Sequence, residues 1–204
     1  PLWVLGSKNR DLFSIKVPAY SEEENINDLL VEIEKTFKDE VDLEIILVDD
    51  GSPVSLEDVI KKSEYKLNIQ IVTNGYNLGQ SKSIEVGLKN SNGDVIGMID
   101  ADCQNPPKEL KKLYDYFIVN NFDAIISYRK NRKDEFLRKT VSRLANFILK
   151  IFTKSKFKDL GSSLKVIKRE CLESLPFKGD MHRFISPMLQ ARGYSIFEIE
   201  VEHA

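Results

Sequence analysis

The chain is poor in cysteine and has no long hydrophobic run, and these two absences exclude several classes of protein. Its 204 residues include two cysteines, Cys103 and Cys171, too few for the disulfide framework of a small secreted domain. Together with His182 and His203 they lack the spacing of a zinc site. No apolar run approaches the roughly 20 residues that cross a membrane as a helix. We therefore expect a globular domain with reduced thiols.

Glycine-rich phosphate loops are missing as well. No Gly-x-Gly-x-x-Gly follows the first predicted strand, which argues against a dinucleotide-binding enzyme, and there is no Gly-x-x-x-x-Gly-Lys-Ser/Thr. A nucleotidyltransferase, which usually needs such a loop, is therefore a weak alternative. Without a glycine cradle, a bound diphosphate must be neutralised by a metal ion and by basic side chains. The net charge of −2 gives no reason to expect nucleic acid as a partner.

The residues that are present fit one domain. A length of 204 residues, with 42% hydrophobic and 30% charged side chains, supports a single substantial core. We expect the domain to cover residues 11–204, with residues 1–10 as a linker or as residues added outside it. An alternating apolar stretch continues almost to Ala204, so we expect a truncation there. The charge is uneven, since residues 20–60 are acid-rich and residues 128–158 are strongly basic.

Strand-like and helix-like segments alternate along the first half of the chain. The predicted strands are 13–17, 44–48, 69–72, 94–99 and 122–127. The predicted helices are 26–37, 56–65, 80–88 and 107–120, the first preceded by a capping box at 21–24. This order predicts an α/β fold with a mostly parallel central sheet flanked by helices on both faces. In the second half, the pattern predicts helices at 135–152 and 181–192 and strands at 163–167 and 195–201.

Polar motifs follow four of the predicted strands, at residues 18–22, 49–52, 77–79 and 100–104. In open parallel sheets, ligands bind beyond the carboxyl ends of the strands. The four motifs should therefore meet at one edge of the sheet and form a site there. Four unrelated turns would give the same pattern, because loops are polar in any case.

The most informative motif is Asp-x-Asp at residues 100–102, directly after the apolar run 95–99. If the strand continues, alternation places Asp100 and Asp102 on the same face. Two neighbouring carboxylates repel each other unless a cation or water separates them. Mg²⁺ and Mn²⁺ prefer oxygen ligands and often take further ligands from substrate phosphates. The motif predicts a metal–diphosphate site, and a polar turn is the alternative.

The order of these motifs resembles that of the family-2 glycosyltransferases, which have the GT-A fold. The resemblance begins with VPAYSEEENI at 17–26, ILVDDGS at 46–52, NLGQ at 77–80 and DADCQNPP at 100–107. Three later motifs, RKTVSRLAN at 138–146, DLGSSLK at 159–165 and HRFI at 182–185, resemble the polyprenyl-phosphate branch of that family. This branch includes dolichyl-phosphate mannose synthases and bacterial polyprenyl-phosphate glycosyltransferases. The resemblance implies a Rossmann-like nucleotide-diphospho-sugar transferase fold over nearly the whole chain.

The resemblance also implies a role for particular residues. Those that would bind the nucleotide are Pro18, Ala19, Tyr20, Glu22, Asp49, Asp50, Gly79, Asp100 and Ala101, with Asp49 and Asp50 on the base and ribose. Those that would hold Mg²⁺ or Mn²⁺, and through it the donor diphosphate, are Asp100, Asp102 and Gln104. Those that would act in catalysis are Asp102, the phosphate-gripping Arg129, Arg138 and Ser142, and Asp159 on the acceptor side.

Four positions depart from the family pattern. Ser21 stands where Asn is usual, Asn105 where Asp is frequent, and Ser162 where Cys is frequent. Lys16 falls in the first predicted strand, where an apolar residue is usual, and this puts the packing of that strand face in question. None of the four changes the Asp-x-Asp motif.

The implied reaction is the metal-dependent transfer of a hexose, with inversion, from a UDP- or GDP-sugar to a dolichyl or undecaprenyl phosphate. A phosphate acceptor is already ionised near neutral pH and needs no strong base, whereas a sugar hydroxyl would need an Asp or Glu. We expect the intact protein to be attached to the cytoplasmic face of a membrane, and this fragment to be soluble. The chain could also form homo-oligomers, and the sequence leaves this point undecided.

Two alternatives remain at this point. The first is a glycosyltransferase of the same fold with a saccharide acceptor, as in capsule synthesis, and the basic segment with Arg138 and Ser142 argues against it. The second is a non-catalytic domain that only binds a nucleotide sugar, and the intact Asp100, Asp102 and Gln104 argue against that. The basic residues between 129 and 143 could also form a solvated surface or contact anionic lipid. Asp159 could simply brace a loop, and His182 is more often structural.

Overall fold

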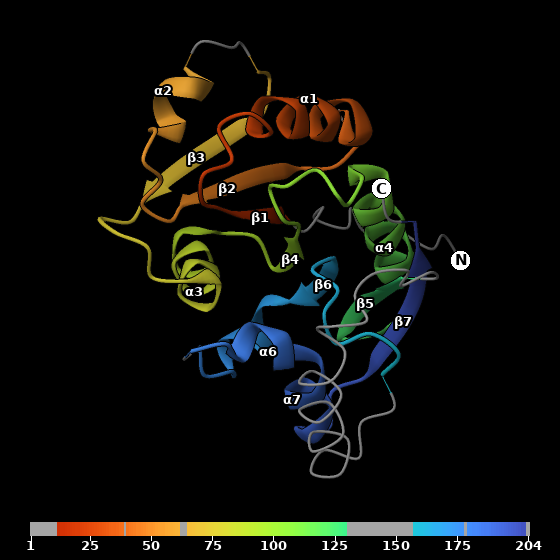
Figure 1. The fold of residues 1–204 in the computed structure, drawn as a ribbon. Helices are drawn as coiled ribbons and strands as arrows, with labels where there is room; N and C mark the ends of the chain where they lie inside the picture. Colours follow the sequence, from red (N-terminus) through yellow and green to blue (C-terminus); the bar gives the residue numbers. More distant parts are fainter. Residues whose placement is uncertain (1–11, 39, 62–64, 130–156, 178, 203–204) are drawn as a thin grey trace.

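The computed structural model describes residues 12–38, 40–61, 65–129, 157–177 and 179–202. The described chain forms a seven-stranded sheet in the order β3-β2-β1-β4-β6-β5-β7 (Figure 1). Its strands are β1 (Phe13–Ala19), β2 (Leu43–Asp49), β3 (Asn68–Thr73), β4 (Val95–Met98), β5 (Ala124–Arg129), β6 (Lys165–Lys168) and β7 (Ile196–Val201). The predicted α/β fold with a mostly parallel sheet is confirmed, because only β6 runs antiparallel to its neighbours β4 and β5.

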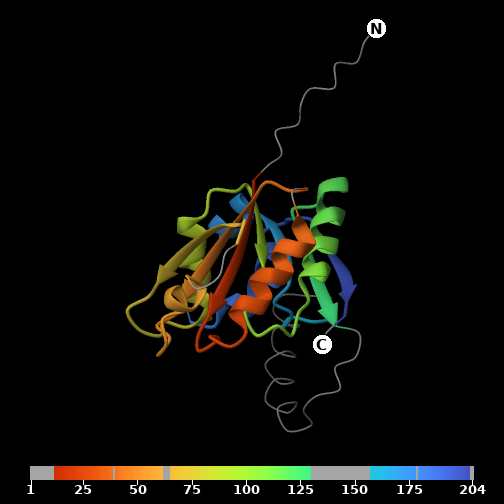
Figure 2. The ribbon, with the colours of Figure 1, turned by 90° about the horizontal axis from the view of Figure 1, so that it is seen from above.

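Helices cover both faces of the sheet (Figures 1 and 2). One face carries α1 (Ile26–Phe37), α2 (Leu56–Ile60) and α4 (Pro107–Val119), whose apolar residues share a core with β1 and β2. The other face carries α3 (Gln80–Asn90), which lies over β1 and β2, and α6 (Arg169–Glu173) and α7 (Ile185–Ala191), which lie over β6 and β7. Buried apolar residues of these three helices share a second core with residues of β4, β5 and β6. Each helix turns an apolar stripe to the sheet, as in α1, where Ile26, Leu29, Leu30, Ile33 and Phe37 are buried.

Several helix boundaries differ from the prediction. The capping box at 21–24 is wrong: Ser21 has a φ of 57° and α1 begins after Asn25, which makes no side-chain cap bond. Helix α2 ends at Ile60 rather than near residue 65. The predicted helix 181–192 divides into a 3₁₀ turn, η1 (Met181–Phe184), and α7. The predicted helix 135–152 lies outside the described residues.

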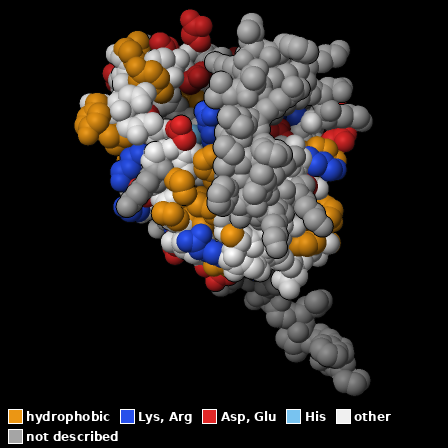
Figure 3. Space-filling view, turned by 60° about the horizontal axis from the view of Figure 1, so that its bottom comes forward, with side chains coloured by type: hydrophobic (Ala, Val, Ile, Leu, Met, Phe, Trp, Pro, Cys, Tyr) orange, Lys and Arg blue, Asp and Glu red, His pale blue; other side chains and the backbone are white. Residues whose placement is uncertain are grey.

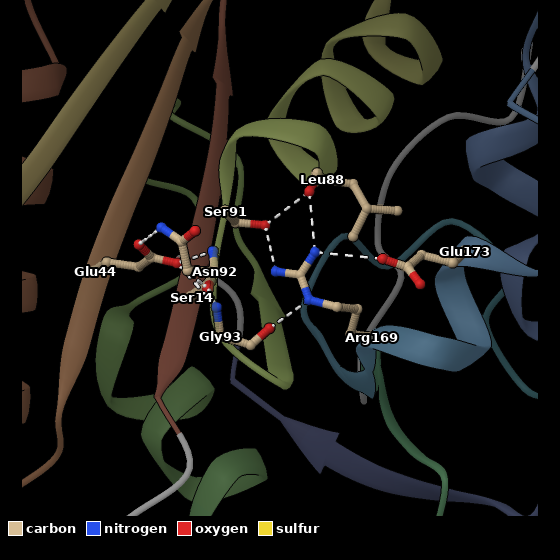
Figure 4. Close-up of polar contacts among 8 residues, drawn as sticks. All are labelled: Ser14, Glu44, Leu88, Ser91, Asn92, Gly93, Arg169 and Glu173. Atoms are coloured by element: carbon tan, nitrogen blue, oxygen red, sulfur yellow. Dashed lines mark hydrogen bonds and ion pairs between the residues drawn. The ribbon is translucent and has the colours of Figure 1, made fainter.

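A polar network fastens the amino edge of the sheet (Figure 4). Arg169, at the start of α6, donates to the backbone oxygens of Gly93 at 2.7 Å and Leu88 at 3.1 Å. The carboxylate of Glu44, on β2, accepts from Ser14 and from the backbone of Asn92 and Gly93. These contacts satisfy buried backbone groups where α3 ends and β4 begins. This network holds the amino edge of the sheet together. The polar groups at the opposite, carboxyl edge take no part in it.

Two lysines lie inside the sheet, on the face covered by α3, α6 and α7. In register, Lys16 of β1 stands beside Met98 of β4, and Met98 stands beside Lys165 of β6. Their exposed fractions are 1% for Lys16 and 5% for Lys165. Lys16 therefore lies in a packed core although it is a lysine, and its buried amine must cost the fold free energy.

The described surface has a mixed character. On the face shown in Figure 3, acidic, basic and exposed apolar side chains are interspersed. This agrees with the small net charge of −2. On this face, the described side chains form no field of one sign.

Candidate active site

A cavity of about 340 Å³ opens at the carboxyl edge of the sheet, between the ends of β1, β2 and β4 and the start of α3. Its volume is in the range of small-molecule sites. It is lined by Pro18, Ala19, Tyr20, Glu22, Asp50, Asn77, Gly79, Gln80, Ser83, Asp100, Ala101 and Asp102. The structure thus brings together most of the predicted nucleotide-binding residues, and it adds Asn77, Gln80 and Ser83, for which no role was predicted.

Asp50 organises one wall of this cavity. Its carboxylate accepts hydrogen bonds from the Asn74 side chain at 2.7 Å and from the backbone N–H groups of Leu78 at 3.0 Å and Gly79 at 2.8 Å. Gly79 has a φ of 86°, which glycine adopts without strain. The carboxylate therefore shapes the loop that leads into α3. The amino end of α3 is held at the cavity, where a helix terminus favours an anion.

Asp49 lies at the end of β2, beside Asp50, but outside the cavity wall. Its side chain is 2% exposed and does not line the cavity. Its two oxygens accept from the backbone N–H groups of Ser52 at 2.9 Å and Leu56 at 3.4 Å. The carboxylate thus closes the turn before α2, and its contact with base or ribose stays a prediction.

Asp100 and Asp102 both line the cavity, although β4 ends at Met98 and strand alternation is not the reason. They lie on the turn after β4. The Asp100 carboxylate accepts from Gln80 Nε2 at 2.8 Å. Burial raises the pKa of Asp100, and the nearby Asp102 carboxylate raises it further, whereas Ser163, Lys165 and Gln80 act in the opposite direction. A cation between the two carboxylates would relieve both effects.

These residues fit a hard divalent cation. The two carboxylates supply oxygen ligands, and an open cavity beside them leaves room for substrate phosphate. Gln104 is exposed and its backbone N–H donates to Asp102 Oδ1 at 3.1 Å. It does not line the cavity, and its role as a ligand stays a prediction.

A second group, Asp123, Glu170 and Cys171, also places potential ligand atoms close together. Asp123 directly precedes β5, and Glu170 and Cys171 lie in α6, just after the end of β6. The group therefore lies at the amino edge of β5, away from the cavity. The Asp123 carboxylate already accepts from Lys168 Nζ at 2.8 Å and from Ser195 N and Oγ at 2.9 and 2.8 Å. Because three donors, one of them the Lys168 ammonium, already occupy this carboxylate, it is a poorer metal ligand than the Asp100–Asp102 pair.

The predicted acceptor side is only partly described. Arg129, at the carboxyl end of β5, donates from Nε to Asp159 Oδ2 at 2.8 Å, and Asp159 is 8% exposed. Asp159 Oδ1 also accepts from the backbone N–H of Gly161 at 2.9 Å. Asp159 therefore fixes both the guanidinium and its own loop. Arg138 and Ser142 lie outside the described residues.

Lys165 and His182 were not predicted as site residues, and only the fold brings them to this edge. The Nζ of Lys165 donates to the carbonyl of Ser162. His182, on η1, has its Nδ1 2.9 Å from the hydroxyl of Ser81 on α3, and burial lowers its pKa. The lysine belongs to the DLGSSLK motif, but its burial depends on the pairing of β6 with β4 and β5, which no local pattern reveals.

The chain is also similar to known proteins. The sequence profile described as Glycosyl transferase family 2 matches residues 14–175. The chain therefore belongs to this family, and its fold is the GT-A fold of the glycosyltransferases.

Two individual relatives carry more specific names than the family does. The chain is 32% identical over 195 residues to undecaprenyl-phosphate 4-deoxy-4-formamido-L-arabinose transferase of Proteus mirabilis, covering 94% of the chain and 59% of that protein. It is 32% identical over 178 residues to dodecaprenyl-phosphate galacturonate synthase of Rhizobium johnstonii, covering 84% of the chain and 52% of that protein. The chain thus spans somewhat more than half the length of these relatives.

A solved structure agrees in fold. Glucosyl-3-phosphoglycerate synthase from Mycobacterium tuberculosis, in complex with Mn²⁺ and UDP-glucose, superposes with a TM-score of 0.72 at 19% identity, covering 95% of this chain and 71% of that one. Within the described ranges, no helix of this chain has the length and apolarity to cross a membrane.

Proposed function

We propose that the chain is the catalytic domain of an enzyme that transfers a hexose from UDP- or GDP-sugar to a polyprenyl phosphate, dolichyl or undecaprenyl, with inversion. The observation that carries this proposal is the juxtaposition of the Asp100–Asp102 pair, in a cavity, with the Arg129–Asp159 ion pair at the same sheet edge. The first pair suits a metal-bound diphosphate and the second suits an acceptor phosphate. Relatives named for transfer to undecaprenyl and dodecaprenyl phosphate support the lipid acceptor.

On the donor side, the walls of the cavity bind the nucleotide. Pro18, Ala19 and Tyr20, at the end of β1, form one wall, and the loop held by Asp50 forms the other. The Tyr20 ring is 48% exposed and can lie against a base. The amino end of α3 faces the diphosphate and favours its charge.

Asp100 and Asp102, with Gln104, would hold Mg²⁺ or Mn²⁺. The ion, when bound, supplies Lewis-acid stabilisation of the leaving diphosphate. The turn 100–104 then has to keep its two carboxylates aimed at one point. The hydrogen bond from Gln80 to Asp100 and the backbone bond of Gln104 to Asp102 do this.

On the acceptor side, Arg129 binds the phosphate, because a guanidinium matches phosphate oxygens. Asp159 holds the guanidinium in place, and Arg138 and Ser142 are proposed to complete the grip. The phosphate attacks as an anion, so no general base is needed. A lipid acceptor also implies a membrane surface as partner, and we propose its cytoplasmic face, where nucleotide sugars are available.

Calorimetric titration with UDP and with GDP, each with and without Mn²⁺, tests the donor site. We expect Mn²⁺-dependent binding of one nucleotide, and its loss in Asp102→Ala. The matched control is Asp115→Ala, which removes a carboxylate that is half-exposed on α4 and paired with Lys111; it should bind as the wild type does. Mn²⁺-dependent binding that persists in Asp102→Ala contradicts the metal assignment.

Transfer is tested with vesicles that contain undecaprenyl phosphate and with a soluble saccharide as the competing acceptor. Sugar transferred to the lipid supports the proposal, and transfer only to the saccharide supports the other acceptor class. Nucleotide binding without any transfer would indicate a binding domain.

A further inference from the structure

Lys165 is a buried charged residue near the candidate site, and neither the sequence nor the proposed reaction supplies a role for it. It opens β6, the strand between β4 and β5, and it is 5% exposed. Among the described residues, its Nζ donates a hydrogen bond to the carbonyl of Ser162. A lysine so deep in a sheet is costly unless its charge is compensated.

Three charged groups are near enough to influence this ammonium electrostatically. Asp100 and Asp159 attract it, and Arg129 repels it. Burial is the largest effect and lowers the pKa of Lys165 to about 8, so most of the side chain is charged at neutral pH. The charge thus lies between the carboxylate assigned to the metal and the ion pair assigned to the acceptor.

The segment from Asp159 to Leu164 connects the same groups. Asp159 holds Arg129, the Ser162 carbonyl accepts from Lys165, and Ser163 Oγ accepts from Asn105 Nδ2 at 3.1 Å, next to the turn that carries Asp100 and Asp102. One short segment therefore contacts the donor side and the acceptor side, and Lys165 lies beneath it.

We propose that Lys165 is a positioning residue that fixes this segment beside the turn that carries the metal carboxylates, and so sets the placement of the acceptor phosphate relative to the donor. This inference rests on the proposed function. The ammonium acts through its hydrogen bond to the Ser162 carbonyl and through its charge near Asp100, and it is not proposed to touch a substrate. Partners of this indirect kind commonly change activity by about 10- to 100-fold when removed.

Loss of the Lys165 ammonium should change Mn²⁺ affinity and acceptor affinity in opposite directions, which simple damage to the fold would not do. Loss of the ammonium removes a positive charge close to Asp100, so Mn²⁺ should bind more tightly, by a factor on the order of ten. The same loss releases the segment that carries Asp159, so the acceptor should bind less well. A misfolded or loosened site would weaken both.

The test compares Lys165→Met with Lys16→Met. Lys16 is the matched control, because it is also a buried lysine, on the same face and in the same register row, roughly 10 Å away across two strand spacings. For each variant, Mn²⁺ affinity is measured by calorimetry with the nucleotide present, and kcat and KM are measured for undecaprenyl phosphate. Lys165→Arg, which keeps the charge and the donor, is the conservative variant.

For Lys165→Met we expect tighter Mn²⁺ binding and a KM for the lipid phosphate raised about 10-fold or more. Lys16→Met should match the wild type in both. Lys165→Arg should keep wild-type Mn²⁺ affinity and have a KM closer to wild type than the methionine variant, and this variant decides the question if Lys165→Met does not fold.

Wild-type KM in Lys165→Met, or Mn²⁺ affinity and transfer that fall together, would overturn the inference while the proposed function stands. Lys165→Arg no better than Lys165→Met would overturn it as well. If the wild-type chain neither binds nucleotide with Mn²⁺ nor transfers sugar, the proposed function itself fails, and the inference fails with it.

Discussion

Lys16 offers a direct measurement of what a buried amine costs this fold. Its side chain is 1% exposed, and its Nζ has no hydrogen-bond partner among the described residues. Its stem is tightly packed, since a Cβ placed on Gly87 of α3 would lie 3.3 Å from Lys16 Cδ. Methionine has a similar unbranched shape without the amine, so Lys16→Met should fill the same space.

The expected gain follows from the missing hydrogen bonds. A polar group buried without partners costs about 1–3 kcal/mol in proteins. Lys16→Met should therefore raise the free energy of unfolding at pH 7 by about 1–3 kcal/mol, and Tm by about 2–10 °C for a domain of this size. Lys89→Met, at a lysine that is 68% exposed on α3, should change it by no more than about 0.5 kcal/mol.

The gain should depend on pH in a definite direction. Burial, and next the charge of Arg169, hold the pKa of Lys16 well below its usual value. Between that lowered pKa and the unfolded value of about 10.4, the unfolded chain binds more protons, so wild-type stability rises with pH. The advantage of Lys16→Met should therefore be larger at pH 7 than at pH 10.

Urea unfolding followed by circular dichroism, at both pH values, measures this difference. Comparing the two proteins at each pH cancels the contribution of Lys165, which titrates in both. A Lys16→Met protein that is no more stable than wild type at pH 7 would refute the reasoning. An advantage of equal size at pH 7 and pH 10 would show that the cost does not come from the ionisable amine.

Two further predictions concern the carboxylates that hold loops. Asp50→Ala removes the acceptor of the Leu78 and Gly79 N–H groups, so it should destabilise the domain by about 2–3 kcal/mol and lower nucleotide affinity in the calorimetric titration; unchanged affinity would show that the loop keeps its shape unaided. Glu44→Gln tests the amino-edge network: hydrogen bonds from Ser14, Asn92 and Gly93 outweigh burial and lower the pKa of Glu44. A depressed carboxylate pKa stabilises the fold above the unfolded pKa and loses this effect as pH falls through the folded value. The difference in free energy of unfolding between Glu44→Gln and wild type, from urea titrations, should thus shrink below about pH 4.5, and a constant difference would contradict the electrostatic explanation.

Much of the fold could be predicted because its signals are local. The apolar stripe of α1 and the apolar runs of β2 and β4 have the periods of the structures they form. The Asp-x-Asp motif was found for the same reason, since a strand end and its turn lie within a few residues. Boundaries were less accurate: Ser21 could not act as a cap once the chain had to turn at that residue.

The tertiary structure alone decided which polar groups face the cavity. Asp49 and Asp50 are adjacent and chemically identical, yet one closes a turn and the other shapes the cavity wall, because each accepts hydrogen bonds from a different loop. Lys165 becomes a site residue only because β6 inserts antiparallel between β4 and β5. The sequence by itself determined the strands, helices and acidic motif through short-range periodicity. The placement of Lys165 beside Asp100 depended on pairing between strands more than sixty residues apart along the chain, which no local pattern encodes.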